Sequence, residues 1–220
     1  MSRLSTPWGR FSAHLQAWFV DHEILRILYR NFFQLSPNAF RSNHPSGRFI
    51  KKLHQQYGLK TIISLRRADT TGQYLLEKEA CDQLGIKLEH ILMSSRELPH
   101  KDKILLSRDT LLHADYPILI HCKSGADRAG LMSVFYRHFV LNEPINEARK
   151  ELSMKYGHFR WADTGKLDYF FDAFTRFAEE HPDVSFIEWV ENHYDREALD
   201  TEFKAAGWAN IVVNKLLRRE

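Results

Sequence analysis

The stretch that most constrains the fold of this 220-residue chain runs from residue 117 to residue 131, where an apolar run ends in a cysteine. Ile118 to Ile120 are too few for a helix, follow a proline and include β-branched side chains, which favours a buried, parallel strand. From Ala129 to Leu141 the apolar residues recur at the spacing of a helix. Cys122 to Arg128 is therefore predicted to be the turn that connects the end of a strand to the start of a helix.

A turn of this kind can bind a phosphate group with its backbone. Its N–H groups and the N-terminus of the following helix point toward one place, which suits an anion. The residues predicted to line this place are Lys123, Ser124, Gly125 and Ala126. Cys122 at its mouth would be stabilised as a thiolate and act as a nucleophile, and the planar guanidinium of Arg128 can hold two phosphoryl oxygens. The alternative, a buried cysteine that only packs, leaves Arg128 at a helix start unexplained.

His121, Cys122 and Arg128 give this segment the pattern H-C-x5-R. The pattern resembles the signature of the cysteine-dependent protein tyrosine and dual-specificity phosphatase superfamily, and a fainter likeness to its bacterial dual-specificity-like members extends from about Phe40 to Tyr156. The resemblance implies an α/β fold with a central, mostly parallel sheet of about four to five strands flanked by helices. It also implies hydrolysis of phosphomonoesters through a phosphocysteine at Cys122, with Arg128 binding the phosphate, His121 supporting the cysteine, and neither cofactor nor metal.

Two positions depart from the superfamily pattern. Ala129 stands where the superfamily usually has a serine or threonine that assists departure of the cysteine, so slow breakdown of the phosphoenzyme is expected. The segment Ile86 to Arg96, where the superfamily usually carries its general acid, contains no aspartate. Asp127 is the predicted general acid, because the G-x-D-R ending of the loop resembles that of myotubularin-type lipid phosphatases, in which an aspartate at this place has that role. Glu97 is the alternative acid.

A second buried strand, at Thr61 to Leu65, is followed directly by Arg66. Ligands of parallel sheets gather at the carboxyl ends of the strands, so Arg66 is a candidate substrate contact, with a solvated arginine as the alternative. Cys81 is predicted to be a buried helix residue, and a resolving partner for oxidised Cys122 is the other interpretation. The patterns also predict strands at 39–42 and 86–92 and helices at 47–57, 70–84 (begun by a capping box at Thr70), 101–114, 144–156, 167–177 and 185–194.

These patterns divide the chain into an N-terminal amphipathic helical segment at 1–35, a phosphatase-like core domain at 36–160 and a helical extension at 161–220 packed on the core. In the first part, charged residues interrupt the apolar ones, which excludes a membrane span. A strap packed on the core and a peripheral membrane contact, suggested by arginines beside tryptophans, both remain open for this segment.

Composition narrows the class of protein further. With 44% hydrophobic residues the chain can form one core of ordinary size. Its formal net charge of +3, without blocks of lysine or arginine, argues against nucleic-acid binding. Its 2 cysteines form no disulfide framework, and a reactive thiolate is best preserved in a reducing compartment, so a cytoplasmic location is expected. The expected partner is a phosphorylated substrate.

Other classes of function fit less well. A P-loop nucleotide binder needs G-x-x-x-x-G-K-[ST], which this loop lacks, and no histidine or cysteine pair has the spacing of a zinc site. A pseudophosphatase that binds phosphate without turning it over remains as an alternative. The sequence also leaves the substrate open among a phosphoprotein, a phosphoinositide or other phospholipid, and a sugar phosphate.

Overall fold

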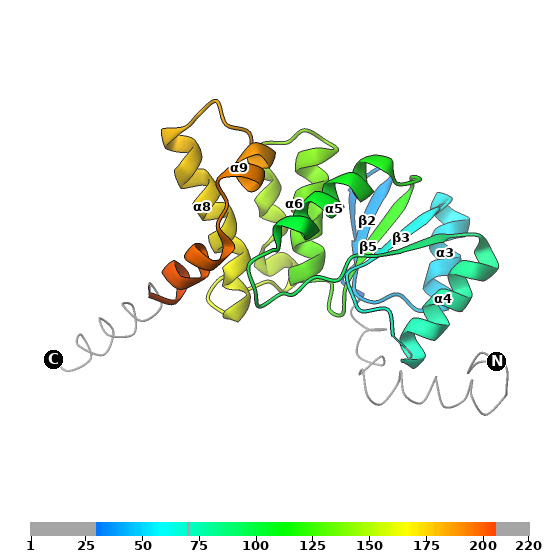
Figure 1. The fold of residues 1–220 in the computed structure, drawn as a ribbon. Helices are drawn as coiled ribbons and strands as arrows, with labels where there is room; N and C mark the ends of the chain where they lie inside the picture. Colours follow the sequence, from blue (N-terminus) through cyan, green and yellow to red (C-terminus); the bar gives the residue numbers. More distant parts are fainter. Residues whose placement is uncertain (1–29, 70, 206–220) are drawn as a thin grey trace, which may run out of the picture.

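A central sheet organises the computed structural model, which describes residues 30–69 and 71–205 (Figure 1). Its five strands lie in the order β1-β2-β5-β3-β4. They are β1 (Phe33–Ser36), β2 (Ala39–Ser42), β3 (Thr61–Ser64), β4 (Lys87–His90) and β5 (Ile118–His121). β1 is antiparallel to β2 and the other neighbours are parallel, which confirms the predicted mostly parallel sheet.

The central strand β5 is buried along its whole length, as are its neighbours β2 and β3. Alternate side chains of each strand enter two separate hydrophobic clusters, one on each face of the sheet. Leu119 belongs to one cluster, while Ile118 and Ile120 belong to the other. This burial on both faces explains why the strands are short runs of apolar residues without polar alternation.

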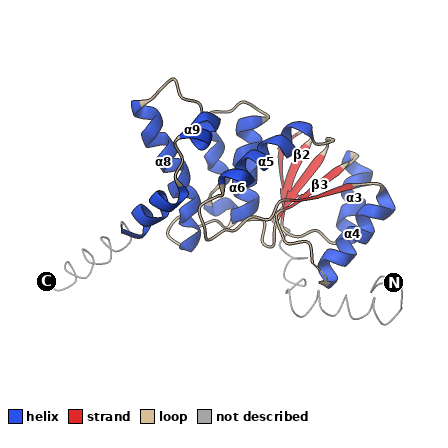
Figure 2. Ribbon diagram, in the orientation of Figure 1, coloured by secondary structure: helices blue, strands red, loops and turns tan. Residues whose placement is uncertain are grey.

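Helices cover both faces of the sheet (Figure 2). α3 (Gly47–Tyr57) and α4 (Gly72–Leu84) cover one face, and α5 (Lys101–His113) and α6 (Asp127–Phe139) cover the other. The N-cap of α4 is Thr71, whose hydroxyl accepts a hydrogen bond from the N–H of Tyr74. The cap predicted at Thr70 was therefore misplaced by one residue.

The C-terminal extension packs on α6, on the side away from the sheet (Figure 1). It contains α8 (Lys166–Glu180) and α9 (Phe186–Asn192), and residues 196–205 are also helical. Phe135 of α6 contacts Phe171 and Phe186 of the extension, with ring centroids 6.2 and 6.3 Å apart. These aromatic contacts make the extension part of the main hydrophobic cluster. Among the described residues, no helix is both long and apolar enough to cross a bilayer.

Two stretches differ from the sequence predictions. Phe33–Ser36, predicted as the end of a helical segment, is the edge strand β1, because it pairs with β2. The helix predicted over 144–156 is the short α7 (Ile145–Ala148) followed by the 3-10 turns η2 (Arg149–Glu151) and η3 (Met154–Tyr156). Leu152 between the turns has a non-helical backbone, which interrupts the helix. The rest of the N-terminal amphipathic segment, up to residue 29, and residues 206–220 lie outside the described part of the chain.

Candidate active site

The predicted phosphate loop lies where the sequence places it, between the end of β5 and the start of α6. Cys122 is the first residue after β5, and its side chain is directed into the loop, where Sγ accepts a hydrogen bond of 3.2 Å from the N–H of Gly125. The cysteine is buried, with 1% of its surface exposed. The sulfur thus lies at the N-terminus of α6, in contact with the backbone of the loop.

The backbone carbonyls of the loop point away from the sulfur. Asn31 donates to the carbonyl of Ser124 at 2.9 Å, and Arg41 donates to those of Gly125 and Ala126 at 2.8 and 3.0 Å. The C=O of one residue and the N–H of the next lie on opposite sides of a trans peptide. The N–H of Gly125 accordingly lies on the Sγ side, and a loop whose carbonyls are bound from outside in this way can form a cradle for an anion.

Gly125 is required by this arrangement. Its φ of +79° lies in the left-handed region, and a Cβ on it would come within 2.7 Å of the backbone N of Asn43 and 2.8 Å of the carbonyl carbon of Ser42. No side chain fits there without moving the backbone that follows β2. The glycine lets the phosphate loop rest directly on that neighbouring segment.

Arg41 is a supporting residue that the sequence prediction missed. It lies in β2 with none of its surface exposed, stacks over the Tyr156 ring at 3.9 Å and forms an ion pair of 2.8 Å with Glu151. Burial lowers the pKa of Arg41, and Glu151 opposes this effect. A charged residue inside a predicted strand was the available signal, because such a residue is buried only with partners.

Arg128 is anchored at the carboxyl end of β3 and lines a cavity beside the loop. Its Nη1 donates to the carbonyl of Leu65 at 3.0 Å. The cavity has a volume of about 500 Å³ and is bounded on the other side by the loop after β4. The basic side chains that line it are Arg67, Arg96, His100, Lys103 and Arg128. This concentration of positive charge suits an anionic ligand.

The other predicted substrate contacts differ in where their side chains lie. Lys123 and Ser124 are exposed on the loop, and the hydroxyl of Ser124 accepts a hydrogen bond of 3.4 Å from the N–H of Ala126. Arg66 donates to the side-chain oxygen of Gln73 at 2.6 Å, and it is the next residue, Arg67, that lines the cavity. The structure thus brings Arg67 and Arg128 together at the cavity and directs Arg66 toward α4.

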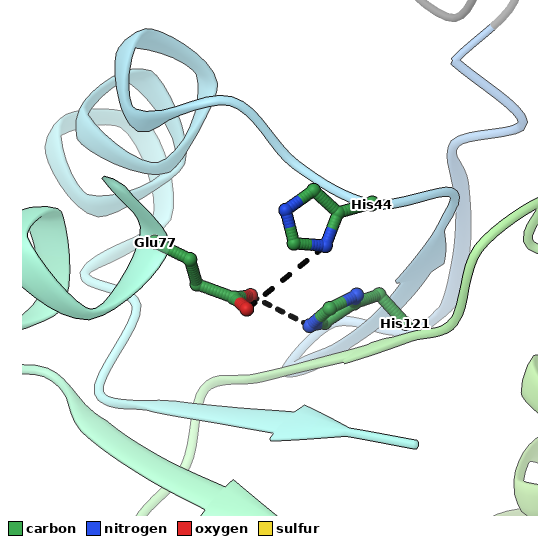
Figure 3. Close-up of side chains that lie close together, drawn as sticks. All are labelled: His44, Glu77 and His121. Atoms are coloured by element: carbon green, nitrogen blue, oxygen red, sulfur yellow. Dashed lines mark ion pairs between the residues drawn. The ribbon is translucent and has the colours of Figure 1, made fainter. Parts of the chain in front are cut away.

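His121, predicted to support the cysteine, belongs to a buried cluster with Glu77 and His44 (Figure 3). His121 Nε2 lies 2.7 Å from Oε1 of Glu77, and His44 Nδ1 lies 3.9 Å from Oε2 of Glu77. Burial alone would raise the pKa of Glu77, but the imidazoles of His121, His44 and His90 outweigh burial and lower this pKa to about 2. Glu77 is therefore a buried carboxylate that forms an ion pair with the histidine that precedes Cys122.

Among the described residues, the donor atoms of His44, Glu77 and His121 lie within 4.8 Å of one another and could share a metal ion. The 2.7 Å between Glu77 Oε1 and His121 Nε2 is an ion-pair distance, although neither atom makes a hydrogen bond within the described part of the chain. It is shorter than the separation of roughly 3.3 Å between two donors around tetrahedral zinc. The geometry therefore fits an ion-paired cluster better than a metal site.

Asp127, the predicted general acid, is the first residue of α6 and contacts His158. Its Oδ1 lies 2.8 Å from His158 Nδ1, and the other ring nitrogen, Nε2, lies 2.7 Å from Oδ2 of Asp168 in α8. Burial alone would lower the pKa of His158, but hydrogen bonds to the two carboxylates raise it to about 9. No sequence pattern connects these three residues, which the fold brings together from separate segments.

Glu97, the alternative acid, lines the cavity together with Arg128. Its carboxylate lies 3.2 Å from Nη2 of Arg196, which belongs to the C-terminal extension. Arg196 Nε also donates to the carbonyl of Leu98 at 2.9 Å, and the hydroxyl of Tyr194 donates to that of Pro99 at 2.8 Å. The loop that carries Glu97 is thus held by residues almost a hundred positions later in the chain.

Cys81 is buried in α4, in the cluster on the face of the sheet opposite that of Cys122. Burial, reinforced by Glu77 and Asp82, raises the pKa of its thiol to about 12. A thiol of this kind is unreactive, which supports the interpretation of Cys81 as a packing residue rather than a resolving partner.

Comparisons with known proteins agree with this geometry. The sequence profile of the tyrosine phosphatase family matches residues 26–142, which is more than half of the chain. A comparison with curated protein sequences found no significant match. Solved structures similar in fold include the three described next. Their sequence identities to this chain are low, so the similarity shows the fold alone.

The first is TpbA from P. aeruginosa, which is 22% identical with a TM-score of 0.54 over 66% of this chain and 84% of that one. TpbA has also been solved as a variant in complex with pTyr. The second is the core catalytic domain of the PP-IP phosphatase SIW14 from S. cerevisiae, with 22% identity and a TM-score of 0.51 over 69% of this chain and 93% of that one. The third is PTPMT1, with 15% identity and a TM-score of 0.52 over 68% and 99%.

Proposed function

We propose that this chain, which belongs to the tyrosine phosphatase family and is a cysteine-dependent phosphatase, hydrolyses phosphomonoesters through a phosphocysteine at Cys122. The observation that supports this best is the phosphate loop, whose carbonyls are bound from outside while the N–H of Gly125 donates to the sulfur. A phosphoryl group in this cradle would lie against Sγ, with Arg128 at the adjoining cavity.

The reaction proceeds in two displacements. In the first, the bond from Sγ of Cys122 to phosphorus forms while the bond from phosphorus to the leaving oxygen breaks, and the leaving oxygen takes a proton from the general acid. In the second, a water oxygen attacks phosphorus, the bond to sulfur breaks, and the water proton returns to the same acid. The loop N–H groups and Arg128 stabilise the charge that spreads over the phosphoryl oxygens in both transition states.

Asp127 is the proposed general acid, because it directly precedes Arg128 in the loop and the side chain remains 21% exposed. Glu97 is the alternative, because it lines the same cavity as Arg128. A general acid matters most for leaving groups that cannot depart as anions. Asp127→Asn is therefore expected to slow an alkyl phosphate far more than nitrophenyl phosphate, whereas Glu97→Gln would do so if Glu97 were the acid.

A small, highly anionic substrate is the second candidate, supported by the five basic side chains around the cavity. An inositol phosphate, phospholipid head group or sugar phosphate that carries a second phosphate presents more negative charge in a small volume than a single phosphotyrosine. Arg67, Arg96 and Lys103 would bind the groups that are not hydrolysed. A reducing, cytoplasmic location is proposed as well, because it preserves the thiolate.

The function is tested by phosphate release from a panel of nitrophenyl phosphate, a phosphotyrosine peptide, inositol phosphates, phospholipid phosphomonoesters and sugar phosphates. Wild-type protein should release phosphate from at least one of them in the presence of a metal chelator. Cys122→Ser should reduce turnover to a few per cent or less, as should Arg128→Lys, whose single ammonium cannot replace the planar fork. A wild-type chain that binds phosphate but hydrolyses none of the panel would be a pseudophosphatase.

A further inference from the structure

The buried side chain of His158 connects the C-terminal extension to the phosphate loop. The ring lies between two carboxylates: Asp127, at the start of α6, and Asp168, in the first turn of α8. Both nitrogen-to-oxygen distances, 2.8 and 2.7 Å, are those of strong hydrogen bonds. With both carboxylates ionised, the ring donates from both nitrogens and is an imidazolium, which agrees with the raised pKa of His158.

The two ends of this chain of hydrogen bonds differ in exposure. The His158 side chain is 1% exposed and that of Asp168 is 10% exposed, whereas that of Asp127 is 21% exposed. Asp127 is thus the end at which a proton can be exchanged with another molecule, and it is also the end next to Arg128. Asp168 is the inner anchor that fixes the orientation of the ring.

We propose that Asp127 and His158 act as one unit that holds a single exchangeable proton, with His158 as the positioning residue and Asp168 as its anchor. This inference rests on the proposed function, in which Asp127 is the general acid. In the first displacement the unit gives its proton to the leaving oxygen and becomes a carboxylate beside a neutral imidazole, which still donates from Nε2 to Asp168. In the second displacement it takes a proton from the attacking water and returns to its starting state, so the proton count balances over the cycle.

The proton shared with His158 allows acid catalysis at a pH where an isolated aspartate has already lost its proton. An unperturbed aspartic acid has lost its proton above a pH of about 4 and can assist departure only in acid. The proton shared with His158 is retained until the pH rises through about 9, because two carboxylates hold the imidazolium. A poor leaving group can then be protonated at neutral pH.

Other charged groups lie near the ring, in the hollow that His158 and Asp168 help to line. They are Arg149, Lys150, Lys155, Arg160 and Asp172. Arg149 and Arg160 each form an ion pair of 2.6 Å with Asp172. The two carboxylates bound to the ring therefore remain its direct electrostatic partners, and His158 keeps its proton despite the neighbouring cations.

The test compares an alkyl phosphate with nitrophenyl phosphate across the pH range, because their rate ratio cancels the ionisation of the enzyme groups that both reactions share. Each rate is first corrected for the separately measured ionisation of its own phosphate, which differs between the two substrates. His158→Gln places an amide donor toward Asp168 and removes the one toward Asp127. His158→Asn does the opposite: it keeps a donor toward Asp127 but cannot release a proton. An exposed histidine–aspartate pair on α5, His113 with Asp109, supplies the control His113→Asn.

In the wild type, the alkyl-to-aryl ratio should hold through neutral pH and fall as the pH rises through about 9. Both His158 variants should lower the ratio at pH 7, by roughly a hundredfold if a general acid is lost, and His113→Asn should leave it unchanged. His158→Asn with a normal ratio at pH 7 would show that the histidine only orients Asp127 and supplies no proton. If the variants do not fold, a wild-type ratio that already falls between about pH 4 and 6 contradicts the proposal. These results are distinct from failure of the proposed function, in which the wild type would hydrolyse neither substrate through Cys122.

Discussion

Two buried histidine–carboxylate clusters flank the phosphate loop, and they are built in opposite proportions. On the side of α4, one carboxylate, Glu77, lies between His121 and His44. On the side of α8, one imidazole, His158, lies between Asp127 and Asp168. The first lowers the pKa of its single carboxylate to about 2, and the second raises that of its single imidazole to about 9.

The two clusters differ in their exposure to solvent, and this difference suits the same residue types to two tasks. The cluster around Glu77 is closed, with side chains 8%, 2% and 0% exposed, so it can hold a geometry but cannot exchange protons with substrate. The cluster around His158 has one open end at Asp127. We therefore assign support of the nucleophile to the first cluster and proton transfer to the second.

Removal of the single carboxylate from the closed cluster should have the largest effect. Glu77→Ala leaves two buried imidazoles without their anion, and loss of one partner of a buried pair costs about 3 to 5 kcal/mol. Denaturant unfolding measures this cost. The control is Asp82→Ala on the same helix, whose exposed pair with Lys78 should contribute little to stability. Equal losses in the two variants would show that the buried cluster adds nothing specific.

The loop between the clusters should tolerate no side chain at its glycine. Gly125→Ala adds a Cβ that clashes with backbone as well as left-handed strain, so we expect a loss of about 2 to 4 kcal/mol and of activity. Gly157→Ala is the matched control, because φ is +80° there but the nearest atom, the Cβ of Ala126, is 3.8 Å away. It should cost only the strain, about 1 to 2 kcal/mol. Thermal unfolding and nitrophenyl phosphate hydrolysis distinguish the two.

The two clusters should lose stability on opposite sides of neutrality. Glu77 has a folded pKa of about 2, below its ordinary 4.5, so its contribution is present above 4.5 and is lost as the pH falls toward 2. His158 has a folded pKa of about 9, above its ordinary 6.5, so its contribution is present below 6.5 and is lost as the pH rises through 9. In unfolding curves from pH 3 to 10, Glu77→Gln should flatten the acid side and His158→Asn the alkaline side. The reverse assignment would contradict the account.

The smallest effect is expected at the loop that carries Glu97. Arg196→Ala removes a partly exposed ion pair and a hydrogen bond to the carbonyl of Leu98, so catalysis should change by roughly threefold to tenfold. Arg176→Ala, which breaks an exposed pair with Glu202 elsewhere in the extension, is the control. A far larger loss, confined to alkyl phosphates, would indicate that Glu97 rather than Asp127 is the acid.

The position of the candidate nucleophile, in a loop between a strand and a helix, could be predicted from sequence because all three lie in one contiguous segment. Cys122 to Arg128 carries its own strand end, glycine and helix start, and each signal is local. Strands β3 and β5 were predictable for a related reason, since their apolar runs are too short for a helix, contain β-branched residues and are bounded by turns. The edge strand β1 was missed because its residues continue a helical spacing, and only pairing with β2 decides its conformation.

The supporting residues could not be predicted, because their roles exist only after folding. Arg41 reaches the loop carbonyls across the sheet, and Glu151 meets it from a turn that sequence periodicity assigned to a helix. His158 and Asp168 lie 31 and 41 positions after Asp127, a separation at which no spacing rule applies. Asp127 could therefore be named as a candidate acid from the sequence, but its contact with His158 could not be predicted.

A covalent intermediate on Cys122 is the central claim, and rapid quenching tests it most directly. Ala129 is buried in the first turn of α6 and offers no hydroxyl to help the sulfur depart, so the phosphoenzyme should accumulate in the steady state. Wild-type protein mixed with nitrophenyl phosphate, quenched in acid and digested should yield the peptide that contains Cys122 with one added phosphoryl group, in an amount approaching one per chain. Turnover with no phosphorylated peptide at any quench time, or with the phosphoryl group on another residue, would contradict the account.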